Sequence, residues 1–439
     1  MLYLNYILFL LFVLFVWQIP RIKSHILCSP LEEEYVLQIN GVEVLWLIMF
    51  ATGVVALAAP GVLDLMALRL LALEVVVVGL LFRYRRAIIL NKVFLLYFIM
   101  LGWFALGILY APSFTYGIRT WLKFLYPPIL GMLGMVLIDD IRMWLKSVLW
   151  ARYGAVISLI YYFVPFIDKY IPGFIWYFTA VAVNYISMLS ISMGLMTGTE
   201  RKWSNLIWCI VWLLPCVLWG LRSSMLGSIV AVVTFLIIKL RWSSLPFILG
   251  IVFFGIISIV YIPSIKEKTF GQEKIELQDI LLGRLTFNQI NTNARSNMWG
   301  FFWEEYVTKH PIVGSGTGAI QTYMYENHVF GGLKMPHNDY LQILCDNGFM
   351  GLLLYLTIFG SAIRECFRIK KYYACYLGMD MVASTTGAAL AGVGVTLLTE
   401  NTVAYSVCTL AYPWALYGMM IGIKRKYEYY GSISSHTDV

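Results

Sequence analysis

The stretch from Arg295 to Asn347 concentrates the side chains that could do chemistry. It holds three of the five histidines, His310, His328 and His337, whereas the sequence on either side of it is mostly apolar. An imidazole titrates near neutral pH and can therefore take a proton from an attacking hydroxyl group. A chain that keeps its titratable groups in one polar loop is predicted to carry out its reaction there.

His337 is the candidate general base, because it lies in the constrained polar sequence Pro336-His337-Asn338-Asp339. Proline favours an extended residue before it, and Asn338 or Asp339 can cap a helix that continues into the next apolar run. The pattern therefore places His337 at a helix N-terminus, facing the membrane surface. The alternative is a histidine that only packs beneath the loop.

Arg222 and Arg295 are the candidate anion ligands. Arg222 lies between two apolar runs with almost no loop around it, and Arg295 opens the predicted loop helix. A guanidinium keeps its charge in a low dielectric and offers a planar fork of donors that suits a phosphate. A helix N-terminus also favours an anion. The alternatives are a snorkelling interfacial arginine for Arg222 and a salt bridge to a loop carboxylate for Arg295.

The composition is that of a polytopic membrane protein. Of the 439 residues, 60% are hydrophobic and only 13% are charged, against about 25% charged in soluble domains. The net charge of +8 does not indicate nucleic acid, because the basic residues collect in short connectors between apolar runs, as the positive-inside rule describes. The seven cysteines are scattered and predict neither a disulfide framework nor a zinc site.

The positions of the apolar runs predict an all-α bundle of about 12–13 transmembrane helices. Basic and poorly charged connectors alternate from residue 42 onward, which puts the C-terminal end in the cytoplasm and the loop 263–347 outside. The candidate spans are residues 2–19, 42–59, 62–82, 92–110, 118–138, 147–165, 173–197, 203–220, 223–239, 244–262, 348–366, 378–398 and 401–423.

Four regions follow from this topology. They are N-terminal transmembrane helices (1–262), a long outer loop that is expected to be catalytic (263–347), C-terminal transmembrane helices (348–426) and a cytoplasmic tail (427–439). The loop is predicted to be partly helical, because apolar side chains recur at helical spacing from Ser296 to Lys309. The glycine-rich turn 314–318 and a second short helix over 319–326 follow that run.

The ordered motifs of the second half resemble the bacterial O-antigen ligase and polymerase superfamily. They are Arg222 in a tight outer turn, Arg295 with Trp299, Pro311-Ile312-Val313-Gly314-Ser315-Gly316, His337-Asn338-Asp339-Tyr340-Leu341, and Gly348. From Arg295 onward the series spans about 55 residues of an outer loop, just before the last three spans. The first half is similar to the family only in hydropathy.

The resemblance implies an integral membrane glycosyltransferase of the GT-C type. Such enzymes take a glycan from undecaprenyl diphosphate without a nucleotide sugar, a cofactor or a metal ion. Carried over, Arg222 and Arg295 would hold the diphosphate, and His337 would activate the acceptor hydroxyl. The resemblance also implies the bacterial inner membrane, a glycan or lipid A core acceptor, a periplasmic active site and a possible chain-length regulator as partner.

Further residues are candidates for binding the substrate. Arg119 and Lys123 are one helical turn apart and can extend the phosphate site, with interfacial anchoring as the alternative. Glu400, in the last outer turn, can orient an arginine or His337, or can simply cap a helix. The remaining candidates are Asn338, Asp339 and Tyr340 of the sequence His337-Asn338-Asp339-Tyr340-Leu341, which we call the HN motif. A metal site made of His310, His328 and Asp339 is the less favoured alternative, because no two of them have ligand spacing on one helix.

We expect a polymerase that joins lipid-linked repeat units of O-antigen or another surface polysaccharide. An O-antigen ligase, which moves the glycan onto lipid A core, is the alternative within the family. A transporter or flippase of lipid-linked glycans is the alternative from another class. A transporter would be expected to place charged residues near the membrane midplane, often in two related halves. The polar residues here cluster at one face instead.

Overall fold

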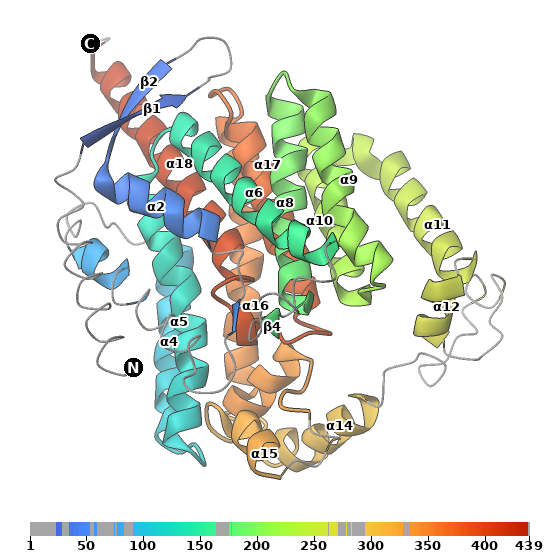
Figure 1. The fold of residues 1–439 in the computed structure, drawn as a ribbon. Coiled ribbons are helices and arrows are strands. Elements are labelled where there is room, and N and C mark those ends of the chain that lie inside the picture. The colour runs from blue at the N-terminus through green and yellow to red at the C-terminus, as the bar shows by residue number, and fades with distance from the viewer. Residues whose placement is uncertain are drawn as a thin grey trace.

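The computed structural model describes residues 23–28, 35–52, 57–58, 74, 77–82, 91–163, 175–176, 178–261, 263–270, 278, 282, 295–327, 330 and 333–437. Within these ranges the protein is a bundle of long helices with a layer of short helices at one end (Figure 1). The bundle contains α2 (Gly41–Thr52), α4 (Lys92–Ile108), α5 (Phe114–Leu137), α6 (Ile141–Phe163), α8 (Phe178–Gly198), α9 (Lys202–Leu218), α10 (Arg222–Leu240), α11 (Leu245–Tyr261), α16 (Asp339–Tyr373), α17 (Met379–Thr396) and α18 (Ala411–Thr437).

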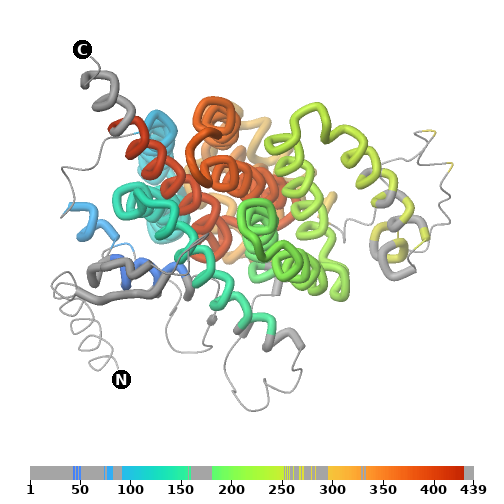
Figure 2. Tube along the Cα trace, turned by 90° about the horizontal axis from the view of Figure 1, so that it is seen from above, coloured from blue at the N-terminus to red at the C-terminus, as the bar shows by residue number. Residues whose placement is uncertain are grey.

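The helical membrane fold predicted from hydropathy is confirmed. The stretches 114–137, 180–198, 222–251 and 339–373 are each long and apolar enough to cross a membrane, and α4 and α9 are shorter apolar helices. The predicted span 2–19 and most of 62–82 lie outside the described residues, so the number of spans stays a prediction. In the view from above (Figure 2), α11 lies at the edge of the bundle.

Small residues let the helices that carry the site approach closely. A Cβ atom on Gly227 of α10 would lie 2.8 Å from the carbonyl oxygen of Gly392 on α17. A Cβ atom on Gly418 of α18 would lie 1.7 Å from the carbonyl oxygen of Gly131 on α5. Glycine at such contacts is how membrane helices pack backbone against backbone. The contact between Gly227 and Gly392 holds the start of α10 against α17, near the turn where the site is built.

The short helices form the layer at the lower end of Figure 1. After α12 (Pro263–Phe270) come α14 (Arg295–Phe302), one π-helical turn (Trp303–Val307) and α15 (Ala319–Asn327). The two predicted loop helices are therefore confirmed. An apolar core of their own fixes them to the start of α16, and its buried members include Met298, Phe302, Ile320, Met324 and Leu344.

Helix α16 bends where the loop crosses it. Gly348 has φ +67° inside the helix, and a Cβ atom there would lie 2.0 Å from the carbonyl oxygen of Ile312. The freed amide of Phe349 donates to the carbonyl oxygen of Pro311 at 2.8 Å. Only glycine tolerates both the positive φ and this close approach. The bend thus locks the Pro-x-x-Gly segment onto the helix.

Two features differ from the sequence expectation. The last helix begins at Ala411 rather than at residue 401, because residues 402–409 form turns that bond to one another and to the start of α16. It then continues to Thr437, into the region predicted as the tail. Two antiparallel pairs of short strands also occur, β1 (Lys23–Cys28) with β2 (Tyr35–Asn40) and β3 (Leu57–Ala58) with β4 (Ile175–Trp176).

Candidate active site

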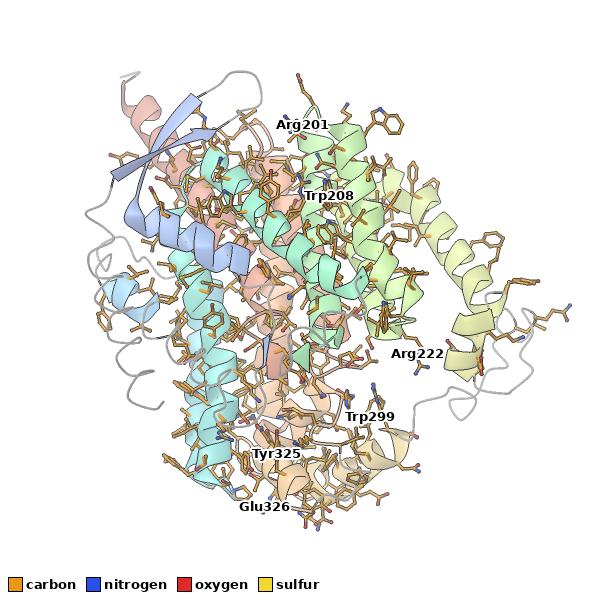
Figure 3. The ribbon with its side chains drawn as sticks, in the orientation of Figure 1. Arg201, Trp208, Arg222, Trp299, Tyr325 and Glu326 are labelled. Atoms are coloured by element: carbon orange, nitrogen blue, oxygen red, sulfur yellow. The ribbon has the colours of Figure 1, made fainter. Side chains whose placement is uncertain are left out.

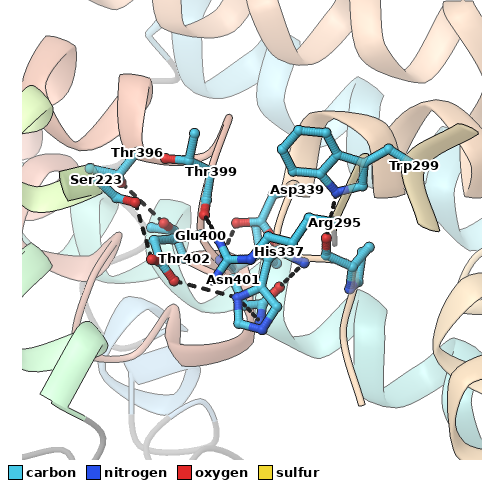
Figure 4. A network of polar contacts seen from close by, with 12 residues as sticks. Ser223, Arg295, Trp299, His337, Asp339, Thr396, Thr399, Glu400, Asn401 and Thr402 are labelled. Atoms are coloured by element: carbon cyan, nitrogen blue, oxygen red, sulfur yellow. Dashed lines mark hydrogen bonds and ion pairs between the residues drawn. The ribbon is translucent and has the colours of Figure 1, made fainter. Parts of the chain in front are cut away.

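Four chain segments meet in one polar network beside the short helices (Figure 4). They are the start of α10, the start of α14, the residues before α16 and the turn after α17. Ser223 reaches Glu400, Arg295 reaches Thr399, and His337 reaches Asn401. The turn at residues 399–401 is therefore the hub that gathers the predicted residues.

The backbone of His337 is held in an unusual conformation. Its φ is +53°, a left-handed value that costs a residue with a Cβ atom of order 1 kcal/mol or more. Its amide donates to Asn401 Oδ1 at 2.7 Å, and Trp299 Nε1 donates to the carbonyl oxygen of Pro336 at 2.7 Å. These two bonds on neighbouring peptide groups compensate for the strain and fix the direction of the imidazole.

The imidazole of His337 has two partners on the same side. Because Asn401 Oδ1 accepts the backbone amide, Asn401 Nδ2 faces the ring and lies 3.1 Å from Nδ1. Glu400 Oε2 lies 3.5 Å from the same Nδ1. The amide can donate to an unprotonated Nδ1, and the carboxylate can accept from a protonated one. No described residue hydrogen-bonds Nε2, the nitrogen on the other side of the ring.

Glu400 divides its carboxylate between two elements. One oxygen accepts from Ser223 Oγ of α10 at 3.1 Å, while the other faces His337. Its side chain is 13% exposed, so solvent screens these contacts only partly. The charge of Glu400 thus links α10 to the imidazole.

Arg222 and Arg295 are brought to the same network from different helices. Arg295 Nη1 donates to the carbonyl oxygen of Thr399 at 2.8 Å, which uses one of the five donors of a guanidinium. Arg222 interacts electrostatically with both Arg295 and Glu400. Its side chain extends from the lower end of α10 toward the layer that contains Trp299 (Figure 3). Two cations held near each other favour an anion between them.

Helix ends add to this positive potential. Helices α10, α14 and α16 begin at Arg222, Arg295 and Asp339, next to the network. Each N-terminus carries about half a positive charge. At α16 the amides of Asp339 and Leu341 are already bonded to the carbonyl oxygen of Leu397 and to Asn338 Oδ1. The site therefore offers an anion both side-chain and backbone charge.

The HN motif anchors the start of α16. Asn338 is its N-cap, and its Oδ1 accepts from the amide of Leu341 at 2.9 Å, as predicted. Asp339 is 2% exposed and accepts from the amide of Val403 at 2.9 Å. The Tyr340 hydroxyl donates to the carbonyl oxygen of Gly394 at 2.8 Å. All three candidate substrate ligands are thus engaged by the protein itself, and we propose that they position His337.

The two candidate cations of α5, Arg119 and Lys123, lie in different environments. Lys123 is half-buried and interacts electrostatically with Asp339, the first residue of α16. Arg119 is exposed and lies 5.9 Å from the ring of Tyr116, which stacks on Tyr325. Lys123 therefore contributes to the field of the site, whereas Arg119 belongs to a surface next to it.

The glycine turn serves the fold rather than an anion. Gly314, Gly316 and Gly318 all have positive φ. The buried carboxylate of Asp346 accepts from the amides of Gly318 at 3.0 Å and Ile320 at 2.9 Å. The backbone donors that a phosphate would need at this turn are thus taken by α16. Sequence reasoning did not single out Asp346, although it lies only nine residues after His337.

Sequence reasoning also missed Ser223, Thr399 and Asn401. They directly follow or flank Arg222 and Glu400 in the two short turns, so the only available signal was this adjacency. His310 lines a separate cavity of about 560 Å³ with Trp103 and Tyr110. His328 lies outside the described residues. Among the described residues, no three of His, Cys, Asp or Glu gather as metal ligands would.

Comparison with known proteins bears on residues 205–356, from α9 to the first half of α16. No curated protein matches the chain. A protein-family model described as O-antigen ligase matches residues 205–356, which include Arg222, Arg295 and His337. The match supports a multi-pass membrane glycosyltransferase of the O-antigen ligase or polymerase type. This part of the chain is therefore similar to the O-antigen ligase family, in agreement with the resemblance of its motifs.

Proposed function

We propose that this protein transfers a glycan from undecaprenyl diphosphate to a hydroxyl of a glycan acceptor at the periplasmic face of the bacterial inner membrane. The observation that carries the proposal is the network in which Arg222, Arg295 and the pair His337–Glu400 meet at one turn. One half of this network suits a leaving diphosphate, and the other half suits an attacking hydroxyl.

The arginines act on the leaving group. As the anomeric carbon–oxygen bond breaks, negative charge grows on the departing diphosphate. Fixed cations and three helix N-termini stabilise that charge more in the transition state than in the ground state, which lowers the barrier. Because Arg295 is tied to Thr399 and Arg222 begins α10, neither has to be reorganised during the reaction.

His337 acts on the acceptor. In the reactive form its Nδ1 carries a proton and faces Glu400, so that the lone pair of Nε2 is available. The acceptor oxygen attacks the anomeric carbon, its proton passes to Nε2, and the bonding electron pair leaves with the diphosphate. Direct displacement of this kind inverts the anomeric centre. These residues perform the step without a metal ion or a nucleotide sugar.

We propose polymerisation as the overall reaction, with a second lipid-linked repeat unit of O-antigen or another surface polysaccharide as acceptor. The loop 263–347 then forms the catalytic region between the two sets of membrane helices, and a chain-length regulator is the expected partner. A ligase would use the same donor side and present lipid A core to His337. The two reactions therefore differ in the acceptor and in the product.

The test is glycan profiling of three strains, one lacking the gene, one carrying the wild-type gene and one carrying His337→Ala. Single repeat units on lipid A core in the deletion and variant strains support the polymerase. Long glycan that accumulates on the lipid carrier instead identifies a ligase. Repeat units trapped on the cytoplasmic side would overturn the transferase in favour of a transporter.

A further inference from the structure

A basic cavity lies at the end of the bundle away from His337. Arg364 follows Asp339 by 25 residues on α16, a rise of roughly 37 Å along a helix. The cavity has a volume of about 540 Å³, within the range of ligand pockets. Three helices supply its cations, which are Lys92 of α4, Arg364 and Arg368 of α16, and Lys424 and Arg425 of α18.

The two acidic residues of the cavity are already neutralised. Glu365 accepts from Lys424 Nζ at 2.8 Å and lies 3.4 Å from Arg368. Glu428 lies 3.6 Å from the same Lys424. Five cations therefore surround two carboxylates, and the cavity keeps an excess of positive charge.

Lys92 and Arg364 carry much of that excess. Neither forms an ion pair with any residue that the structure describes, although both line the cavity. Lys92 is also the first residue of α4, whose N-cap Asn91 and whose Val93 line the same space. The positive end of the α4 dipole therefore adds to the two side chains.

Exposed apolar side chains continue from the cavity along the outer faces of α4 and α16. On α16, Leu353 is 63% exposed and lies eleven residues before Arg364, which puts both on one face. On α4, Ile99 is 53% exposed and lies seven residues after Lys92, again on one face. Gly360 adds open space between Leu353 and Arg364, since nothing lies within 4 Å of a Cβ atom built there. Each face is thus an apolar stripe that ends in a cation.

We propose that this cavity binds the phosphate headgroup of an anionic glycerophospholipid, whose acyl chains lie along the exposed faces of α4 and α16. The phosphodiester of such a lipid supplies a negative charge for Lys92 and Arg364, which have no ion-pair partner among the described residues. The acyl chains of the lipid match the apolar stripes. Basic pockets between membrane helices recognise such headgroups. The volume leaves room for a headgroup with two phosphates. This binding is independent of the glycosyl transfer proposed above, since it uses none of the residues near His337.

The experiment uses the purified full-length protein in nanodiscs of phosphatidylcholine, with or without cardiolipin. Native mass spectrometry measures bound cardiolipin, and thermal unfolding measures its effect on stability. The pocket variant is Lys92→Gln with Arg364→Gln, which removes two cations without breaking an ion pair among the described residues. The matched control is Arg201→Gln with Lys202→Gln, which removes two exposed cations at the start of α9.

We expect cardiolipin to bind and stabilise the wild type and the control, and to bind the pocket variant about thirtyfold more weakly. An equal loss in the control would overturn the proposal, because the attraction would then be general to the basic surface. A wild type that responds no more to cardiolipin than to phosphatidylcholine would also overturn it. Inorganic phosphate at millimolar concentration is the third arm. If it alone reproduces the stabilisation, the cavity takes a free anion and the lipid assignment fails.

Discussion

His337 Nδ1 lies 3.5 Å from Glu400 Oε2, although the two residues are 63 positions apart in the sequence. His337 lies just before α16, and Glu400 lies in the turn after α17. The pair exists because the turn after α17 also binds the backbone of His337 through Asn401 and reaches α10 through Ser223. The imidazole therefore receives its orientation and a carboxylate partner from one turn. This relationship makes the role of each side chain separately testable.

Replacement of His337 should abolish glycan transfer without unfolding the protein. His337→Ala removes the base, and a loss of about 10²–10⁴-fold is expected for general-base catalysis. His337→Gly also removes it but relieves the left-handed backbone strain at φ +53°, so this variant should be at least as stable as His337→Ala. Transfer by purified protein and thermal unfolding measure the two effects.

The matched control for this experiment is His310→Ala. His310 lines the separate cavity with Trp103 and Tyr110 and takes part in none of the hydrogen bonds or ion pairs described for the network. Its replacement should leave transfer within a few fold of the wild type. Normal activity of His337→Ala, or an equal loss in both variants, would contradict the base that we assign.

Glu400→Gln should reduce the rate of the chemical step more than the affinity for the donor. Glutamine keeps an oxygen for Ser223 but carries no charge to pair with a protonated His337. We expect kcat to fall about 10²-fold while KM for the donor changes little, as expected for a group that orients a catalytic base. Glu326→Gln, on the exposed end of α15, is the control. A raised KM with normal kcat would instead place Glu400 in binding.

Arg222→Lys and Arg295→Lys should be much more harmful than a count of charges suggests. Lysine keeps the charge but loses the planar fork that meets two phosphate oxygens together. Arg295→Lys also cannot keep the same bond to Thr399 while facing the donor. We expect a loss of about tenfold or more in kcat/KM for each variant, measured with a lipid-linked donor.

Arg241→Lys is the control for the arginine variants, because Arg241 is exposed at the opposite end of α10. It should transfer glycan at the wild-type rate. If Arg222→Lys behaves in the same way as this control, Arg222 only anchors the helix at the membrane surface.

The sequence predicted the residue types of the site better than their partners. His337, Arg222 and Arg295 stood out because polar residues are rare in so apolar a chain. Thr399 and Asn401 did not, because their contacts join positions 104 and 64 residues apart, and a helical period carries no information at that distance.

The fold shows the same limit at the last helix. Apolar residues from 401 onward predicted a continuous span, but the buried carboxylate of Asp339 takes the amide of Val403 and holds that segment in turns. The segment can leave the helical ladder because Thr409 also bonds the carbonyl oxygen of Thr402 at 2.7 Å. A hydropathy pattern indicates only which residues are buried. These turns depend on one specific tertiary hydrogen bond, from the amide of Val403 to Asp339.

Metal chelation should leave transfer unchanged. The proposed step assigns the leaving-group charge to Arg222 and Arg295 and the proton to His337, so no divalent ion takes part. Activity of the purified protein in excess EDTA, with and without added Mg²⁺ or Mn²⁺, measures this. A strong loss on chelation that the added ion restores would contradict the proposed step.

The contact of Gly227 with Gly392 should be required both for stability and for the site. In Gly227→Ala the added methyl group would lie 2.4 Å from Ile186 Cδ1 and 2.8 Å from the carbonyl oxygen of Gly392. The backbone oxygen cannot move without separating α10 from α17, so the variant should lose about 1–3 kcal/mol of stability. The same separation draws Ser223 away from Glu400, so transfer should fall as well.

The control is Gly102→Ala in α4, where nothing lies within 4 Å of the new Cβ atom and helix propensity favours alanine. Thermal unfolding of both variants in the same detergent checks this, and equal stability would mean that α10 and α17 do not depend on this glycine contact.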